Sequence, residues 1–374
     1  MLPKERMLAV FSHQEPDRVP IGELASDFEM TERILGHPTY YRSKWKEYVA
    51  EWEGRRDEIA YSYGHDVTEL ALKLEWDFIV INTVPGRKPP QKPEMLDKYV
   101  WRDHTGKVWR YDPDTGGHAM LIEAPPMTIE QLVVPDKFEV DESELEAIAQ
   151  TIKDVGETHF VIGRLPESTF AWRQTVGMEE YLTKMITDPE FVARAEDLYA
   201  KRALVLAEAM CQLGVDAIVE CSDYCGNQGP IMGPRFFRQF IKPSLAALVE
   251  VAHSHGVFFL KHTDGDTWSI LDDLVEIGVD GWQGIQPSIG MDLKRLKDRY
   301  AGQLCLFGGV NNETLIAGTP AEVVEEVKYA FRHAAPGGGY VLTSGNTLQP
   351  GTKYENYMAM LQAGKDLGRY PIRI

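Results

Sequence analysis

Residues 203–221 read ALVLAEAMCQLGVDAIVEC, and this stretch decides the fold. The first part, 203–213, has the apolar spacing of a helix, and Gly214 ends that pattern. The apolar run Val215–Val219 then predicts a buried strand that ends at Glu220. A helix that turns back through glycine into a buried strand is one unit of a parallel α/β sheet.

The same pattern repeats further along the chain. Residues 243–255 predict a helix, and after Gly256 the strand VFFLK leads to His262. Residues 268–277 predict another helix, which is followed by Gly278 and the segment VDGWQGIQP. Strands that alternate with helices in this way favour β-α units and a parallel sheet.

Eight apolar segments have the length and composition of strands. Eight is the number of units that closes a TIM barrel, the (β/α)8 fold. We therefore predict an α/β protein in which residues 1–374 form a single barrel domain. A doubly wound open sheet is the alternative, but no G-x-G-x-x-G motif follows an early strand. The predicted strands are Val19–Glu23, Asp77–Asn82, Phe160–Leu165, Ala217–Cys221, Val257–Lys261, Val279–Gln283, Leu304–Phe307 and Tyr340–Thr343.

Two intervals are too long for simple connections between strands. Residues 24–76 predict an N-terminal helical extension. Residues 84–130 contain YVWRDHTGKVWRYDPDTGG, in which two aromatic-rich runs flank the turn D-H-T-G-K and predict an inserted β-hairpin. We interpret both intervals as additions to one barrel.

Composition limits the classes of partner. The 374 residues carry 39 Lys and Arg against 57 Asp and Glu, which gives a formal charge of −18. Nucleic acid and anionic membrane surfaces are therefore disfavoured as partners. The sequence has no secretory signal and no apolar run of membrane-spanning length, and its four cysteines form no dense disulfide framework. These features predict a cytoplasmic protein.

In a barrel of this kind the chemistry takes place at the carboxyl ends of the strands. His262, Thr263 and Asp264 follow the fifth predicted strand, and residues two apart in an extended segment face the same side. The imidazole and the carboxylate of His262 and Asp264 could bind a divalent metal. They could equally bind substrate or transfer a proton. The structural alternative is that Asp264 caps the helix that follows.

Other polar side chains at strand ends complete the set of candidates. Glu220 and Asp223 follow the fourth strand and are candidate catalytic groups with His262 and Asp264, because acidic groups at the end of a buried strand need a partner. Arg164 could clamp a carboxylate or phosphate, or form an internal ion pair with Glu167 or Glu220. For the histidines other than His262 we expect structural or solvent-facing roles. The predicted substrate-binding residues are Asn82, Arg164, Tyr224, Gln286 and Asn346.

Several segments resemble the uroporphyrinogen decarboxylase-like superfamily. They occur in the family's order through nearly the whole chain, and the resemblance implies a (β/α)8 barrel with its cleft at the carboxyl ends of the strands. The segments are PKERMLAVFSHQEPDRVPI (3–21), GPIMGPRFFRQFIKP (229–243), KHTDGD (261–266), FGGVN (307–311) and PGTKYENYMAM (350–360).

The resemblance implies one of two chemistries. One branch of the superfamily decarboxylates uroporphyrinogen without a cofactor and carries an arginine-rich element after its first strand. This chain has IGELASDFEM there, without arginine, and INTVPG after the second strand, without the expected aspartate. The other branch exchanges methyl groups with cobalamin on a partner protein and often uses zinc. This chain is nearer to the methyltransferase branch.

The zinc-dependent members of that branch carry an H-x-C motif at the end of the fifth strand and a further cysteine after the eighth strand. In this chain the motif positions fall on His262 and Asp264, and the later position falls on Asn346. Both thiolates of the family pattern are therefore replaced by oxygen- or nitrogen-bearing side chains. This exchange disfavours a thiol acceptor and favours harder chemistry at the site.

The leading hypothesis is a corrinoid-dependent methyltransferase. It would take a methyl group from a small O- or N-methylated compound and pass it to a cobamide on a partner corrinoid protein, with zinc as a candidate second cofactor at His262 and Asp264. The first alternative is a cofactor-free lyase, a decarboxylase in which Arg164 holds a carboxylate. The second is a non-catalytic protein that binds a tetrapyrrole or corrinoid. The sequence is compatible with a homodimer but does not determine the oligomeric state.

Overall fold

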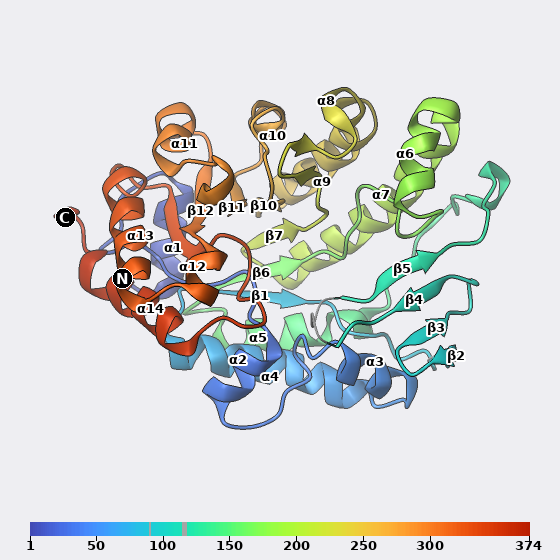
Figure 1. The fold of residues 1–374 in the computed structure, drawn as a ribbon, viewed down its shortest axis with the longest axis horizontal. Coiled ribbons are helices and arrows are strands. Elements are labelled where there is room, and N and C mark those ends of the chain that lie inside the picture. The colour runs from blue at the N-terminus through green and yellow to red at the C-terminus, as the bar shows by residue number, and fades with distance from the viewer. Residues whose placement is uncertain (90, 114–117) are drawn as a thin grey trace.

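The computed structural model describes residues 1–89, 91–113 and 118–374 (Figure 1). In these residues seven strands pair in parallel in one curled sheet, in the order β1-β6-β7-β10-β11-β12-β13. The strands confirm seven of the eight predicted segments, with small shifts of their ends. Their bounds are β1 (Phe78–Asn82), β6 (Phe160–Arg164), β7 (Ala217–Glu220), β10 (Phe258–His262), β11 (Gly281–Ile285), β12 (Cys305–Val310) and β13 (Tyr340–Ser344).

The first predicted strand, Val19–Glu23, is not a regular strand. Ile21 makes a single parallel bridge to Leu342 of β13, and its carbonyl accepts a hydrogen bond of 2.7 Å from the backbone N–H of Asp77. Pro20 has no N–H to donate, so a regular ladder cannot form at that residue. The predicted eight-stranded barrel is thus corrected to seven strands, with an extended segment between β13 and β1 in the eighth position.

Helices cover the outside of the sheet (Figure 1). Gly214 ends α7 in the left-handed conformation, with φ 95°, and Gly278 has φ 86° after α10. Glycine takes this conformation without a steric penalty, which confirms the turns predicted at both positions. The helices between or after the strands are α5 (Glu146–Val155), α6 (Met178–Thr187), α7 (Pro189–Leu213), α8 (Gly233–Phe236), α9 (Lys242–Ser254), α10 (Leu271–Glu276), α11 (Leu293–Tyr300), α12 (Asn312–Ala317), α13 (Pro320–His333) and α14 (Tyr354–Leu367).

The N-terminal helix α1 (Pro3–Phe11) packs against the amino ends of the strands. The ring of Phe11 stacks on Phe258, with centroids 4.5 Å apart, and on Phe160, with centroids 5.3 Å apart. These rings belong to an apolar cluster that fills the barrel interior. The packing closes the amino end of the barrel and leaves the carboxyl ends of the strands as its open mouth.

The predicted N-terminal extension is helical, and the predicted hairpin is larger than expected. The extension forms α2 (Phe28–Leu35), α3 (Trp45–Trp52) and α4 (Arg56–Leu74). The two runs of the hairpin are central in an antiparallel sheet of four described strands: β2 (Glu94–Asp97), β3 (Val100–Arg102), β4 (Val108–Arg110) and β5 (Met120–Glu123). An aromatic cluster that includes Trp45, Trp52 and Trp101 joins α3 to this sheet. Among the described helices, none is long and apolar enough to cross a membrane.

The register of the parallel strands decides which polar side chains become neighbours. Asn82 of β1 lies opposite Arg164 of β6, and His262 of β10 lies opposite Gln283 of β11. Lys261 of β10 lies opposite Glu220, the last residue of β7. These pairs are far apart in sequence, so their proximity depends on the sheet and not on local spacing.

Candidate active site

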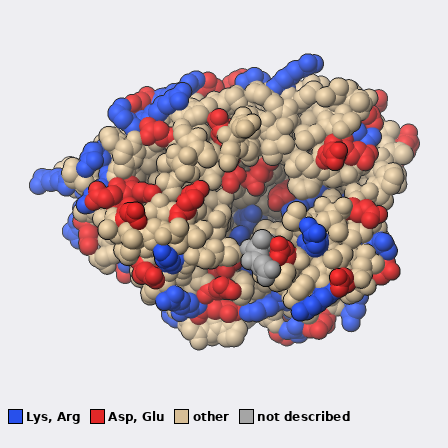
Figure 2. Space-filling view, viewed as in Figure 1, with Lys and Arg blue, Asp and Glu red and all other residues tan. Residues whose placement is uncertain are grey.

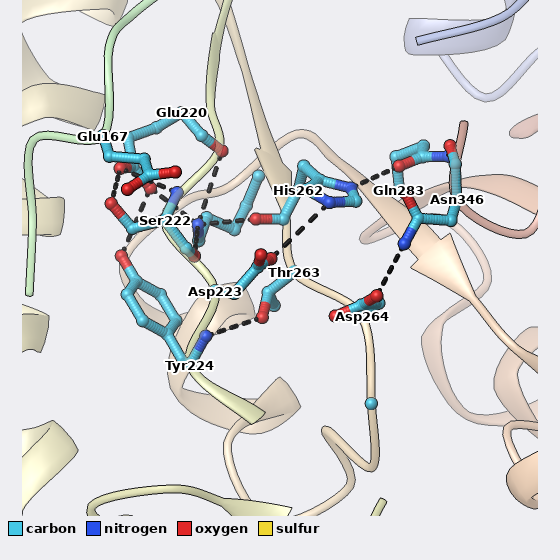
Figure 3. A network of polar contacts seen from close by, with 12 residues as sticks. Glu167, Glu220, Ser222, Asp223, Tyr224, His262, Thr263, Asp264, Gln283 and Asn346 are labelled. Atoms are coloured by element: carbon cyan, nitrogen blue, oxygen red, sulfur yellow. Dashed lines mark hydrogen bonds and ion pairs between the residues drawn. The ribbon is translucent and has the colours of Figure 1, made fainter. Parts of the chain in front are cut away.

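Four predicted residues meet at the carboxyl ends of the strands (Figure 3). Asn346, just beyond β13, donates a hydrogen bond of 2.6 Å from Nδ2 to Oδ2 of Asp264. Asp223, beyond β7, has its carboxylate 3.6 Å from Nε2 of His262. The loops after three strands therefore bring His262, Asp264, Asn346 and Asp223 into one polar group.

The imidazole of His262 is held in one orientation by Gln283. The amide nitrogen of Gln283 donates to the carbonyls of Ser344 (3.4 Å) and Asn346 (2.5 Å). Its Oε1 therefore faces Nδ1 of His262, and that ring nitrogen donates the hydrogen bond. Burial lowers the pKa of His262 to about 4, so the ring is neutral near pH 7. The unprotonated Nε2 then faces Asp223 and the mouth.

The two aspartates of this group have raised pKa values. Asp223 is 56% exposed but stands inside the concave mouth, and its surroundings raise the pKa to about 6, mainly by displacing water. Burial is also the largest cause of the raised pKa of Asp264, and the negative charge of Asp223 adds to it. Two neighbouring carboxyls that both resist ionisation keep a proton to a higher pH than an isolated aspartate does.

Glu220 lies below this group and does not reach the mouth. Its carboxylate is 2.6 Å from Nζ of Lys261, and both side chains are 0% exposed. The same ammonium donates to the carbonyls of Ser222 and His262, each at 2.6 Å. The backbone carbonyl of His262 is thus tied to a buried ion pair. We assign Glu220 a positioning role, in place of the contact with substrate expected from its strand end.

The remaining predicted residues are divided between the mouth and its supports. Tyr224 is fully buried, and its hydroxyl lies 3.3 Å from Glu220 and hydrogen-bonds Thr169. Gln286 accepts a hydrogen bond of 2.9 Å from the backbone N–H of Gly265, which fixes the loop after β10. Tyr224 and Gln286 therefore hold parts of the site in place, and their contact with substrate stays a prediction.

Arg164 and Asn82 stay at the mouth. Arg164 acts on the Cys221 thiol, whose pKa is raised by burial and lowered in part by the charge of Arg164. Arg164 forms no ion pair with Glu220 or any other described carboxylate. The internal salt bridge that the sequence left open for Arg164 is therefore absent from the part of the chain that the structure describes.

Three supporting residues were missed as site residues. Lys261 is a lysine inside the apolar run VFFLK, and that contrast is a signal that could have identified it. Gln283 ends a predicted strand but looks no more significant than Gln286 in sequence. Glu23 is 1% exposed and accepts from the N–H (3.0 Å) and hydroxyl (2.7 Å) of Ser344. Burial raises the pKa of Glu23 to about 8, so its carboxyl stays protonated near pH 7.

A metal site depends on which donor side chains come together at the mouth. Within the described residues, no three His, Cys, Asp or Glu side chains come together in an arrangement that could hold a metal ion. The four cysteines are buried and free, and none replaces the thiolates missing at Asp264 and Asn346. Asn346 also directs its amide N–H, not its oxygen, at Asp264. The donor set does not fit a tetrahedral zinc centre.

Comparisons with known proteins give three findings. The model of the uroporphyrinogen decarboxylase (URO-D) family matches residues 112–367. The methylcobamide:CoM methyltransferase MtaA of Methanosarcina barkeri (strain Fusaro / DSM 804) is 25% identical over 220 residues, which are 59% of this chain and 62% of MtaA. A solved methyltransferase structure from Methanosarcina mazei superposes with a TM-score of 0.71 at 21% identity, over 98% of this chain and 99% of that one.

These findings differ in what they establish. The structural match shows a shared fold, because its sequence identity is low. The match to MtaA spans 62% of the length of that enzyme, so the activity of the whole relative does not transfer directly. The family model covers well over half of the chain, including the strands that carry His262 and Asp264. The chain therefore belongs to the uroporphyrinogen decarboxylase (URO-D) family.

Proposed function

We propose that this protein is a corrinoid-dependent methyltransferase. It would take a methyl group from a small O- or N-methylated compound and pass it to a cobamide carried by a partner corrinoid protein. The similarity to an enzyme named methylcobamide:CoM methyltransferase supports the reaction class and the cobamide. The meeting of His262, Asp264 and Asn346 at the barrel mouth carries the proposal, because these are the positions where the family resemblance places its methyl-transfer ligands.

Side chains of this protein would protonate the leaving group of the methyl donor. The cobamide supplies the nucleophile that accepts the methyl carbon. When the bond between this carbon and the substrate oxygen or nitrogen breaks, the electron pair stays on the heteroatom, which must then gain a proton. Asp223 is accessible and holds its proton to about pH 6, so it is the donor that we assign. The neutral His262 beside it accepts or relays the proton through Nε2.

The replacement of both cysteines indicates the direction of methyl transfer and the kind of methyl donor. MtaA, by its name, transfers methyl groups to the thiol CoM. Coordination of a soft metal site activates a thiol acceptor. At the two positions where the family pattern has cysteines, this chain has Asp264 and Asn346, which are harder ligands. Transfer from an O- or N-methyl donor requires a proton donor instead, and the two aspartates provide one. The side chains present therefore fit proton donation better than a thiol-activating zinc site.

The test is direct methyl transfer in vitro. Purified protein is incubated with cob(I)alamin and a panel of O-, N- and S-methyl donors, including methoxylated aromatics, and methylcobalamin absorbance is followed. We expect transfer from at least one O- or N-methyl donor, and His262→Ala should lower the rate by about 10²- to 10⁴-fold, the usual contribution of a proton-transfer group. Arg110→Gln, which removes an exposed charge from β4, serves as the control.

Two results would contradict the proposal. One is the absence of transfer from every donor, despite tight binding of another ligand. The other is release of carbon dioxide from a carboxylic acid without any corrinoid, which would favour the cofactor-free lyase in which Arg164 holds the carboxylate. The cytoplasmic location and the homodimer stay predictions from the sequence.

A further inference from the structure

Basic side chains gather at one side of the barrel mouth. Arg42 and Lys44 precede α3, Arg164 ends β6, and Arg173 lies in the segment after β6. We call these four residues the cationic wall. Figure 2 shows a hollow on this face, with Lys and Arg atoms at its floor and acidic atoms along its upper edge. The wall is notable because the chain as a whole carries a charge of −18.

His118, which precedes β5, lies within range of the charges of the cationic wall. His118 is exposed at the surface, yet the surrounding atoms of the mouth, which displace water, and the charges of Arg42, Arg164, Lys44 and Arg173, in that order of effect, together lower its pKa to about 3. All four cations therefore act on one imidazole, although they come from three separate parts of the chain. The sequence predicted a structural or solvent-facing role for His118, and the structure leaves this side chain exposed, within charge range of the four cations.

The wall is short of negative partners. Lys44 is 3.1 Å from the carboxylate of Asp27, and Arg173 is 3.4 Å from that of Glu167. Arg42 and Arg164, by contrast, form no ion pair with any carboxylate in the described part of the chain. Within the residues that the structure describes, the Nε groups of Arg42 and Arg173 are buried without a hydrogen-bond acceptor. A buried charged donor without an acceptor is costly, so these groups point to an absent anion.

The backbone holds the wall in place. Arg42 and Lys44 both have φ 54°, a left-handed conformation that non-glycine residues rarely adopt and that clusters at ligand-binding segments. The backbone of Ala119, next to His118, donates to the Tyr48 hydroxyl (3.4 Å) and accepts from Arg173 (3.1 Å). The inserted sheet, α3 and the segment after β6 are thereby joined around the same hollow.

The wall also lies within charge range of the proposed chemistry. The positive charge of Arg164 partly offsets the raised pKa of Asp223 and adds to the lowering of the pKa of His262. A small molecule that contacts Arg164 with one end can therefore present its other end to Asp223 and His262. This arrangement would orient a methyl group that sits opposite an anionic group in the same molecule.

We propose that the cationic wall binds the oxyanion of a small methylated substrate, a carboxylate or a sulfonate, through Arg42 and Arg164. The inference rests on the proposed function and names the substrate class of the same site. Guanidinium groups match such planar or trigonal oxyanions through paired hydrogen bonds. The neutral His118 completes the pocket as a hydrogen-bonding group.

Binding of three matched compounds tests the inference. 4-Methoxybenzoate, 4-methoxybenzenesulfonate and the uncharged 4-methylanisole are titrated into the full-length protein by calorimetry. We expect one or both anions to bind and the neutral compound to bind much more weakly. Arg42→Gln should weaken anion binding by about 10- to 100-fold, as for the loss of a charged hydrogen bond. Arg42→Lys should recover part of the affinity, and Arg110→Gln, an exposed arginine of β4, should leave it unchanged.

A second readout does not depend on affinity alone. Bound anion should raise the pKa of His118, followed by NMR of the ring, because a negative charge offsets the surrounding cations. Preference for benzoate or for sulfonate identifies the oxyanion. Equal binding of the neutral compound, or an unchanged affinity in folded Arg42→Gln, would overturn the inference. Arg42-dependent anion binding without any methyl transfer would instead overturn the proposed function and leave the anion subsite standing.

Discussion

Gln283 lies directly opposite His262 in the parallel pairing of β10 with β11, and its amide oxygen accepts the hydrogen bond from Nδ1 of that imidazole. The amide nitrogen of Gln283 is occupied by the carbonyls of Ser344 and Asn346, so the amide cannot turn over without losing both bonds. One residue on a neighbouring strand therefore decides which nitrogen of His262 faces the substrate.

Replacing Gln283 should disturb the site without removing any group that contacts substrate. Gln283→Leu frees Nδ1 of His262, and we expect kcat for methyl transfer to fall by about 10- to 100-fold, the effect found for partners that orient an imidazole. Gln303→Leu, at an exposed glutamine, is the matched control. Nitrogen NMR of the ring should show a mixed tautomer in the variant. An unchanged tautomer together with full activity would show that Gln283 does not orient the ring.

The pH dependence of the rate should follow Asp223. Its pKa is raised to about 6, so the protonated form is present below that pH and is lost above it. We expect kcat to decrease as the pH rises through about 6, with His262 neutral over the same range because its pKa is about 4. Asp223→Asn should remove this decrease and lower the maximum rate. A profile that rises with pH through this interval would contradict the role of proton donor.

The buried ion pair beneath the site should matter for stability. Lys261→Met leaves the carboxylate of Glu220 buried without its partner, and we expect a loss of about 3–5 kcal/mol in the free energy of unfolding. The double variant with Glu220→Gln removes both charges and should recover part of that loss. Denaturant unfolding followed by circular dichroism measures both. A double variant as unstable as the sum of the single variants would argue against direct coupling.

The seam that closes the barrel should depend on Asp77. This carboxylate is 0% exposed, lies 2.5 Å from Arg6 and 2.7 Å from Arg18, and accepts from the backbone N–H of Ile21 at 2.7 Å. Asp77→Ala leaves two guanidinium groups without this partner, so we expect a loss of about 3–5 kcal/mol in unfolding free energy. Asp197→Ala, which breaks an exposed pair on α7, should cost less than about 1 kcal/mol. Equal effects of the two substitutions would show that the seam does not rely on Asp77.

Metal content should separate this protein from relatives with a thiolate site. Because the mouth offers His262 and Asp264 without a thiolate, we expect zinc to be substoichiometric after dialysis. Methyl transfer should then survive a chelator. Elemental analysis and activity before and after chelation are the measurements. Stoichiometric zinc that is lost in His262→Ala would restore the metal site predicted from the sequence and require a ligand set that the described residues do not display.

The architecture was predictable because its signals are local. A helix that ends at Gly214 and a strand that ends at Glu220 depend on spacing within about twenty residues, and each such signal held. The exceptions have physical causes. Pro20 cannot take part in a regular ladder, so the segment around Ile21 closes the barrel with one bridge instead of a strand. The inserted sheet has two outer strands, β2 and β5, that the sequence did not predict, because their short sequences show little alternation of apolar and polar residues.

The sequence alone determined the order of helices and strands, the family, and the chemical types available at the strand ends, since each of these is a property of the chain read in order. Only the tertiary structure decided which of those groups act together. The register of the sheet paired Glu220 with Lys261 and His262 with Gln283. The docking of the insert against α3 brought His118 within charge range of Arg42 and Arg164. Burial then set which groups keep their protons, and burial is a property of packing between distant segments, which no local pattern encodes.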